Sequence, residues 1–532
     1  MGKTVIVEEK ASNFSSGTSA DSFGVGNNTA NKTYYKSFQP DFDPYIAYDP
    51  VLQTWVRRDS EASVEIPFAD ATASEEENFV ATEIGFHHTN QKPLTPAYGL
   101  DAITNLVDSG LSVVKVSTTA GANNHDKLIA AIASASAGDI VWVDIASFAE
   151  TFDGGELVIN TPIHLVGYNG DPAETIITMG TGTVGASQSC LRLNVGGTGP
   201  LWKDRVVISG ITIDGAGINT TDDGINVTGF HAVLVDKSYV TYENCVAKNC
   251  YGFGFNLESV STTTDFVFKD CVASYCAHGF KAGGGTVEDM KILNCVAHDN
   301  RHHPSSSGTT GSGFFIRPLL IRFIMKDCAS ISNQEHGFST EQFTCDSLVE
   351  NCLFEGNGWD INAFNPSGCK ISQGDGEEVD GLTFKRCVFR HNGLRAPFTD
   401  TDGNDRGIGV LFKVKTATSK DVLFEECTFD NNGHIGIHWH GRDGEAPTTS
   451  NFVVKDCNFY NHEFAGLGMD NLGSTENQII TATGNYWGST DGASGTGPGT
   501  GDATLTSTPY GAKRVANEGE TLQTSIIVLT ID

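Results

Sequence analysis

Residues 240–250 read VTYENCVAKNC, and this phrase decides the fold because variants of it recur along the chain. Each copy has alternating apolar residues, then as a rule an acidic or amide residue, then a cysteine. The copies are FVFKDCVASYC (266–276), MKILNCVAHDN (290–300), FIMKDCASISN (323–333), SLVENCLFEGN (347–357), LTFKRCVFRHN (382–392), VLFEECTFDNN (422–432) and FVVKDCNFYNH (452–462). A phrase that returns every 24 to 40 residues or so indicates a structural repeat.

Each repeat predicts two or three short strands and no helix. Apolar and polar residues alternate with period two, which is a strand signal. A polar, glycine-bearing turn follows each cysteine phrase and leads into another strand, as in GFGFNLE (252–258) and GIGVLFK (407–413). Such a unit cannot bury its own apolar face, so the units must stack. Strands that rise about 4.8 Å per coil form a β-solenoid.

The cysteines and asparagines predict two columns inside the solenoid. Eight cysteines share one phase: Cys245, Cys271, Cys295, Cys328, Cys352, Cys387, Cys427 and Cys457. We expect small buried core residues rather than metal ligands, because this spacing is not that of CxxC zinc sites. An asparagine follows five of them by five residues, at Asn300, Asn333, Asn357, Asn392 and Asn432. These asparagines predict a ladder bonded to turn backbones, with Cys250, Cys276 and His462 in the same place in the outer coils.

The pattern resembles the right-handed parallel β-helix, or pectin-lyase-like, superfamily over about residues 124 to 499. DKLIAAIASASAGD (126–139) resembles its capping helix, with Leu128, Ile129 and Ile132 expected over the open end of the cylinder. GNYWGSTDGASGTGPGTGDAT (484–504) resembles the segment after its last coil. In organisation the chain is most similar to tailspikes and related virion proteins of tailed phages. The resemblance implies an all-β, single-stranded right-handed parallel β-helix. It does not assign an activity, because the superfamily includes lyases, hydrolases, epimerases, adhesins and tailspikes.

Three regions are predicted along the chain. Residues 1–120 form a separate attachment module, with a flexible arm, β-like pieces at 34–68 and a helix at 96–109. Residues 121–499 form the β-helix. Residues 500–532 form a closing segment with one strand, TSIIVLTID (524–532), and without coiled-coil heptads.

Composition limits the partners. The chain has 34 Lys and Arg against 65 Asp and Glu, a formal charge of −31. This charge argues against nucleic acid as a partner, because binding to phosphates needs a basic surface. It also argues against simple electrostatic binding of an acidic polysaccharide, unless the protein has a local basic patch. The sequence shows no membrane span and no signal-peptide core, and its thirteen cysteines suit a reducing compartment. We expect folding in a host cytoplasm followed by assembly into a virion, with secretion as the alternative.

Candidate site residues follow from the register of the strand after each glycine turn. Inward pairs are predicted at Ile225/Val227, Phe255/Leu257, Phe280/Ala282, Phe314/Ile316, Phe338/Thr340, Ile361/Ala363, Val410/Phe412, Ile437/Trp439 and Leu467/Met469. The outward residues between them form two clusters. One holds Arg317 and Glu341 on adjacent coils, with His336 near the turn and the aromatic residues Phe315 and Phe364 nearby. The other holds Lys413, His438, His440 and Asp470, with Arg442, Asp443 and Glu445 in the next loop.

These clusters carry the predicted chemistry. Elimination at a uronate needs a base at the sugar C5 and a cation at the carboxylate, which Lys413 or His440 together with Arg442 would supply. Glu341 completes the candidate catalytic set. Substrate binding is predicted for Arg317, His438, Asp470, Phe315 and Phe364, with aromatic rings stacked on sugars. The competing interpretation is structural, because charged residues outside a solenoid are usually solvated or paired between coils. No cofactor is expected; calcium is kept as an alternative, although no calcium-binding repeat indicates it.

The first functional hypothesis is a tailspike-type virion protein. It would be a homotrimer, would join other virion proteins through residues 1–120, and would recognise, and if active cleave, host surface polysaccharide. One alternative is a bacterial lyase or C5-epimerase acting on an acidic glycan. Another is a capsid decoration or adhesin-like β-helix without activity.

Overall fold

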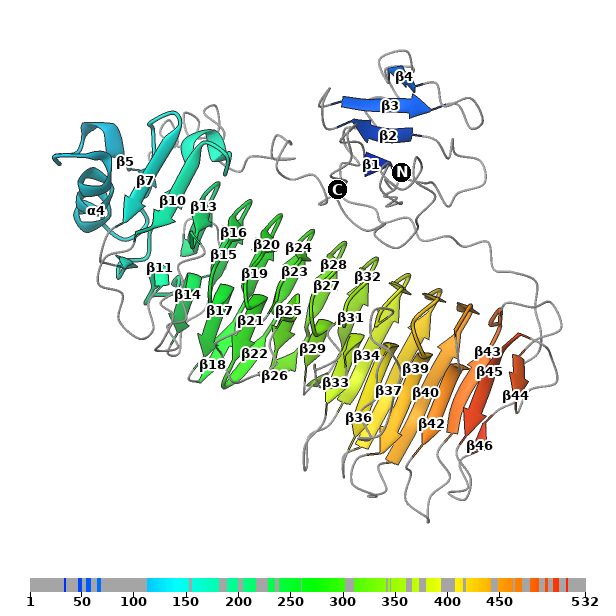
Figure 1. Cartoon of the computed structure of the whole chain (residues 1–532). Coiled ribbons are helices and arrows are strands. Elements are labelled where there is room, and N and C mark those ends of the chain that lie inside the picture. Colours follow the sequence, from blue (N-terminus) through cyan, green and yellow to red (C-terminus); the bar gives the residue numbers. More distant parts are fainter. Residues whose placement is uncertain are drawn as a thin grey trace, which may run out of the picture. The chain divides into compact units, whose positions relative to one another are not determined.

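The structure of the protein is a computed structural model, shown in Figure 1. It describes residues 112–152, 156–180, 189–199, 204–216, 228–234, 239–259, 261–301, 311–340, 343–344, 346–359, 366–372, 379–393, 407–414, 418–441, 448–462, 465–470, 479–487, 493–495, 501–506 and 513–514, and four strands between residues 33 and 67. The chain divides into two compact units, residues 1–94 with 523–532 and residues 95–522.

The first unit contains a small antiparallel sheet. Its strands β1 (Thr33–Tyr34), β2 (Ile46–Asp49), β3 (Thr54–Arg58) and β4 (Glu65–Pro67) pair in sequence order. These strands coincide with the β-like pieces predicted at 34–68. The predicted helix at 96–109 and the predicted last strand at 524–532 lie outside the described residues.

The second unit is a stack of coils made from three parallel sheets. In one coil, β15 (Val240–Glu243) precedes the cysteine, β16 (Val246–Lys248) follows it, and β17 (Phe253–Ser259) follows the glycine turn. We call the sheets that these strands belong to sheet 1, sheet 2 and sheet 3. The next coil repeats the pattern with β19 (Phe266–Lys269), β20 (Val272–Ser274) and β21 (His278–Gly283).

Successive coils pair in parallel and in register, as the stacked arrows of Figure 1 show. In the part of the chain that the structure describes, sheet 2 has eleven strands and sheet 3 has thirteen. The predicted right-handed parallel β-helix is confirmed.

A helix covers the N-terminal end of the stack. Asn123 is the N-cap of α4 (Asn124–Ser134), and its side chain accepts a hydrogen bond from the Asp126 backbone N–H at 2.7 Å. Leu128, Ala131 and Ile132 are buried with the spacing of one helix face, but Ile129 is 43% exposed. The expectation that Ile129 closes the cylinder is therefore wrong, because it lies about 100° around the helix from Leu128. No helix among the described residues is long and apolar enough to cross a membrane.

The β-helix extends beyond both predicted limits. β5 (Val113–Lys115) pairs in parallel with β6 (Ile140–Trp142) in sheet 1. β45 (Gly501–Thr506) pairs with β42 (Ala465–Asp470) in sheet 3. These end strands lack the cysteine phrase, so the repeat does not mark them as coils.

The cysteine phrase forms the bend between sheets 1 and 2. All eight of its cysteines are free and have no exposed surface, as expected for core residues. The residue before each cysteine has a positive φ: Asn244, Asp270, Asn294, Asp327, Asn351, Arg386, Glu426 and Asp456. Asn and Asp tolerate this left-handed conformation best, which explains why they precede most of the cysteines.

Burial predicts that these thiols are unreactive. It raises the pKa of the Cys190 thiol to about 12, and it leaves the eight cysteines of the repeated phrase without any exposed surface that a reagent could reach. The test uses a Cys345→Ser variant, because Cys345 is the one cysteine outside the described residues. DTNB reacts with the thiolate form of cysteine. We therefore expect the folded variant to react with DTNB more than about a hundredfold more slowly than a free thiol does, and to react fully once it unfolds. Rapid labelling of several thiols at native conditions would contradict the buried column.

The predicted asparagine ladder is present at the bend between sheets 2 and 3. The Asn333 side-chain oxygen accepts from the Asn300 backbone N–H at 3.1 Å and from the Asn300 side-chain amide at 2.8 Å. The same bonds link Asn333 to Asn357, and the ladder continues through Asn392 to Asn432, whose amide lies 3.3 Å from His462 Nε2. All five asparagines are fully buried.

The ladder requires a glycine beside it in each coil. A Cβ built at Gly409 would lie 3.0 Å from Asn432 Nδ2 and 2.5 Å from the Gly436 carbonyl oxygen. Equivalent contacts occur at Gly279, Gly313, Gly337 and Gly368. This glycine column therefore sets where each strand of sheet 3 begins.

A buried histidine in the first coils makes stability depend on pH. His164, in β9 (His164–Val166), has no exposed surface, and burial lowers its pKa from 6.5 to about 4. Between those two values the unfolded chain binds more protons than the folded chain, so stability falls as the pH falls. From pH 7.5 to 4.5 we expect His164 to account for a loss of about 2 kcal/mol, at 1.36 kcal/mol per pKa unit.

The measurement is urea unfolding at both pH values for the native chain and a His164→Asn variant. The variant should lose about 2 kcal/mol less than the native chain. Equal losses in the two proteins would contradict a neutral, buried His164.

Candidate functional site

Sheet 3 presents the predicted outward columns. The inward positions of five predicted pairs are fully buried, namely Phe255/Leu257, Phe280/Ala282, Phe314/Ile316, Val410/Phe412 and Ile437/Trp439. Phe338 and Thr340 are also fully buried. The residues between these inward positions point to the outside of the solenoid, because side chains alternate across a strand.

Two predicted inward pairs, Ile225/Val227 and Ile361/Ala363, lie outside the described residues, and other residues hold their register positions in sheet 3. The strand that pairs with Phe255 and Leu257 is β14 (Thr228–Leu234), with Phe230 and Ala232 in place of the predicted Ile225 and Val227. Likewise β33 (Ser367–Ser372) supplies Cys369 and Ile371 in place of the predicted Ile361 and Ala363. The reason is the glycine column, since Gly229 and Gly368 are the glycines that stand at the corner.

This correction changes one candidate binding residue. Phe364 lies outside the described residues, and the outward positions of that coil belong to Lys370 and Ser372. Glu341 and Arg442 also lie outside the described residues. Asp470 pairs in register with His440, but its side chain is outside the described part of the chain.

The first cluster combines aromatic rings with cations. Phe315, in β25 (Phe314–Ile316), stacks on His278 with ring centroids 4.5 Å apart. The Arg317 guanidinium lies 5.4 Å from the Phe315 ring, and its side chain is exposed. Lys281 Nζ lies 3.9 Å from the ring of Phe253. Burial lowers the pKa of Lys281, Glu258 opposes this change, and the Arg317 charge adds to it.

The second cluster lies on two adjacent strands of sheet 3. β36 (Ile408–Val414) carries Lys413 and β39 (Ile435–Gly441) carries His438 and His440. Lys413 and His440 are direct register partners, so their backbones are about 4.8 Å apart. The His438 and His440 ring centroids are 5.6 Å apart. Lys413 is only 7% exposed and His438 only 3%, so both side chains are largely covered by their neighbours on the outer face of sheet 3.

A third polar cluster surrounds His336, which the sequence placed near the turn of the first cluster, but its partners Ser367, Glu335 and Ser312 were not predicted. Ser367 Oγ lies 3.2 Å from His336 Nδ1, and His336 Nε2 lies 3.4 Å from a Glu335 carboxylate oxygen. The other Glu335 oxygen accepts from Ser312 Oγ at 3.4 Å. Burial lowers the pKa of His336. Burial would raise the pKa of Glu335, but the neighbouring His336 and Lys370 outweigh it, so that this pKa is lowered.

This third cluster joins three coils at the corner before sheet 3. Its serines are fully buried, which gives a substrate no access to them. It contacts the first cluster through the Ser312 backbone N–H, which donates to His278 Nδ1 at 3.3 Å. This third cluster can be recognised only in the structure, because its residues come from separate repeats of the sequence. Among the described residues no group of three or more His, Cys, Asp or Glu side chains is placed to hold a metal ion.

Comparison with known proteins adds a likeness of fold. No protein-family model matches the chain, and no curated protein matches its sequence. Tailspike protein 3 of bacteriophage CBA120 is 14% identical, over 93% of this chain and 75% of that chain, with a TM-score of 0.39. The mannuronan C-5 epimerase A-module from Azotobacter vinelandii is 16% identical, over 76% of this chain and 94% of that chain, with a TM-score of 0.43.

An α-1,3-glucanase catalytic unit from Streptomyces thermodiastaticus is 12% identical, over 77% of this chain and 68% of that chain, with a TM-score of 0.41. Identities and TM-scores of this size do not assign a function. The function is therefore argued from the residues of this chain.

Proposed function

We propose that this protein is a tailspike-type virion protein that recognises a host surface polysaccharide through the outer face of sheet 3. The observation that supports it best is the gathering of cations, imidazoles and a stacked aromatic ring on that one face, in a chain with a net charge of −31. Solenoids offer extended surfaces of this kind to long ligands. Residues 1–120 would join other virion proteins, and the assembly would be a homotrimer.

The two described clusters suit different parts of a sugar chain. Phe315, held by His278 and flanked by Arg317, offers a ring against which the apolar face of a sugar stacks. Lys413, His438 and His440 offer hydrogen-bond donors to hydroxyl and carboxylate oxygens. Both clusters face outward from sheet 3, so one polysaccharide running along the solenoid axis can meet them in turn.

Cleavage is a second candidate function, favoured by the adjacency of Lys413 and His440. In a β-elimination, His440 would remove the proton at C5 of a uronate while Lys413 neutralises the carboxylate, and Arg442 would add a second cation. The C4–O bond would then break as the C4–C5 double bond forms, and the leaving oxygen would take a proton from water or from the protonated His440. A C5-epimerase would need the same pair and also an acid on the other face of the sugar, which returns a proton to C5. A decoration or adhesin-like protein would use the face for binding alone.

The test is binding of the full chain to an array of bacterial surface polysaccharides. We expect at least one polysaccharide to bind, and Phe315→Ala and Arg317→Ala each to weaken its binding about tenfold. Lys291→Ala is the matched control, because Lys291 is a half-exposed cation on sheet 1. Failure of every polysaccharide to bind, or equal losses in the control, would contradict the proposal.

A further inference from the structure

The asparagine ladder contains a sequence that is chemically unstable in an unfolded chain. An asparagine followed by glycine loses its side-chain amide spontaneously, because glycine has no side chain to hinder the ring closure that this reaction requires. The protein has four such pairs, of which one is Asn169 with Gly170, in η4 (Tyr168–Gly170). The other three belong to the ladder: Asn357 with Gly358, Asn392 with Gly393 and Asn432 with Gly433.

The reaction is an attack within the chain itself. The glycine nitrogen loses its proton to water or hydroxide and forms a bond to the asparagine Cγ. The Cγ–Nδ2 bond then breaks, and the nitrogen takes up a proton and leaves as ammonia. Water opens the resulting succinimide ring at one of its two carbonyl groups, which gives aspartate or isoaspartate. The chain therefore needs only water and the freedom to bring the glycine nitrogen onto Cγ.

The folded ladder occupies the glycine nitrogen of each pair. Each N–H donates to the carbonyl oxygen of the ladder asparagine one coil before it, with N···O distances of 2.9, 2.7 and 2.9 Å for Gly358, Gly393 and Gly433. A nitrogen that is bonded to a neighbouring coil cannot turn toward the side chain of the preceding residue unless the two coils separate.

The asparagine side chains are held in place as well. Asn392 donates through Nδ2 to the Phe354 carbonyl oxygen at 3.1 Å and to Asn432 Oδ1 at 2.8 Å. Its own Oδ1 accepts from the Asn357 backbone N–H at 3.1 Å. Because these asparagines have no exposed surface, water also cannot reach them to take up the proton.

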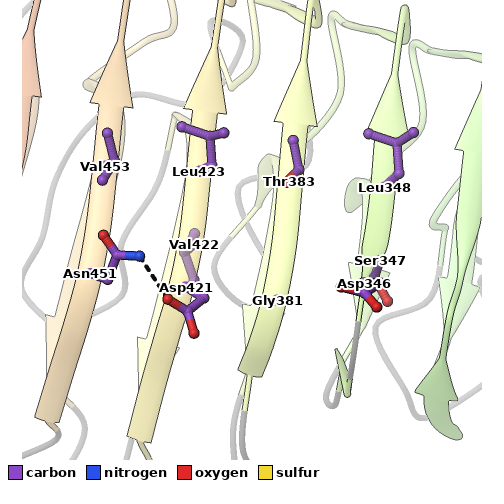
Figure 2. Close-up of a pocket in the computed structure, with 10 residues that line it drawn as sticks. All are labelled: Asp346, Ser347, Leu348, Gly381, Thr383, Asp421, Val422, Leu423, Asn451 and Val453. Carbon is purple, nitrogen blue, oxygen red and sulfur yellow. Dashed lines mark hydrogen bonds between the residues drawn. The ribbon is translucent and has the colours of Figure 1, made fainter.

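Exposed asparagines follow the opposite pattern. Figure 2 shows Asn451, in β40 (Thr448–Lys455), whose side-chain amide donates to Asp421 of β37 (Thr418–Glu425) at 2.6 Å. Asn451 is exposed, but Phe452 follows it in the chain. Apart from Asn169, no exposed asparagine among the described residues is followed by glycine. The unstable pairs thus lie mainly where the ladder buries them.

We propose that Asn357, Asn392 and Asn432 are latent deamidation sites, which the folded ladder keeps closed and which open when the coils separate. The aspartate that forms is a carboxylate at neutral pH, so it accepts hydrogen bonds but cannot donate to the next rung as asparagine does. A chain that reacts while unfolded therefore cannot rebuild the ladder. Unfolding becomes irreversible through this modification, independently of what the protein binds.

The experiment follows deamidation of the full chain at mildly alkaline pH, in buffer and in guanidinium chloride, by mass spectrometry of its peptides. In denaturant we expect all three ladder sites to react. In buffer they should react at least about a hundredfold more slowly, because the reaction waits for a rare opening of the coils. Asn169 should react faster in buffer than the ladder sites do, since its side chain is exposed.

The same samples contain matched controls. Asn300 and Asn333 belong to the ladder but are followed by Arg301 and Gln334, so they should stay unmodified in both solutions. Ladder sites that react as fast in buffer as in denaturant would overturn the protection. Ladder sites that stay intact in denaturant would show that they are not latent sites.

The end of the ladder offers a variant that tests the ladder bonds directly. Asn432 Nδ2 lies 3.3 Å from His462 Nε2, so His462→Ala removes a partner of this rung. In the folded variant we expect Asn432 to react about tenfold faster and Asn357, two coils away, to react as before. His298→Ala is the control, a histidine in β24 (Val296–His298), and it should leave Asn432 unchanged. Equal rates at Asn432 in both variants would contradict protection by the ladder.

Refolding measures the consequence of the modification. Chains kept in denaturant for increasing times should recover their β-sheet circular dichroism on dilution in proportion to the fraction with all three ladder sites intact. Full recovery by chains that are modified at these sites would show that deamidation does not make unfolding irreversible.

Discussion

Replacing Gly409 by alanine is expected to lower the free energy of unfolding by about 3 kcal/mol or more. The added methyl group would lie 2.5 Å from the Gly436 carbonyl oxygen and 3.0 Å from the Asn432 amide nitrogen. The first of these atoms is backbone, so relief requires that neighbouring coils move apart. Such a movement also strains the buried asparagine ladder, whose polar groups have no water to replace their partners.

Gly283→Ala is the matched control for this prediction. Gly283 lies in the same sheet, and the nearest atom to its added Cβ is the Lys281 Cε at 3.8 Å. We expect that variant to stay within about 0.5 kcal/mol of the native chain. Urea unfolding with unchanged m-values measures both. Equal stability of the two variants would show that the glycine column does not set the corner.

The double variant Lys413→Met/His440→Gln is expected to weaken polysaccharide binding about a hundredfold. Each side chain would lose a charge-assisted or strong hydrogen bond, at roughly tenfold apiece. Methionine and glutamine preserve much of the volume, which matters because Lys413 is 7% exposed. If the protein cleaves a uronate polymer, its kcat should fall by about 10²- to 10⁴-fold, as for loss of a general base.

The control for the double variant is again Lys291→Ala, with thermal unfolding of each protein to show that the coils remain folded. A double variant that is folded and binds as the native chain does would remove Lys413 and His440 from the site. Loss of cleavage with unchanged binding would instead favour the lyase.

Most of the fold is predictable from the sequence because the repeat places one residue type at each special position. The cysteines mark the core, Asn and Asp mark the left-handed bend, and the Asn ladder marks the next corner. Errors arise where the repeat is weakest. The sequence around Ile361 and Phe364 alternates apolar and polar residues as well as the sequence of β33 does. Only the close approach of Gly368 to Asn392 identifies β33 as the strand that belongs to sheet 3.

The site is less predictable for a physical reason. Outward side chains are placed by register, which puts Lys413 beside His440 correctly, but their burial depends on what surrounds the sheet. The Ser367, His336 and Glu335 cluster joins residues of different coils and has no local motif.

The most direct test of the central claim is the structure of the full chain with a bound oligosaccharide from the polysaccharide that it recognises. The account predicts sugar density along the outer face of sheet 3, over β25, β36 and β39, with contacts to Phe315, Arg317, Lys413 or His440. Density confined to sheet 2 or to the residues 1–94, with sheet 3 empty, would contradict it.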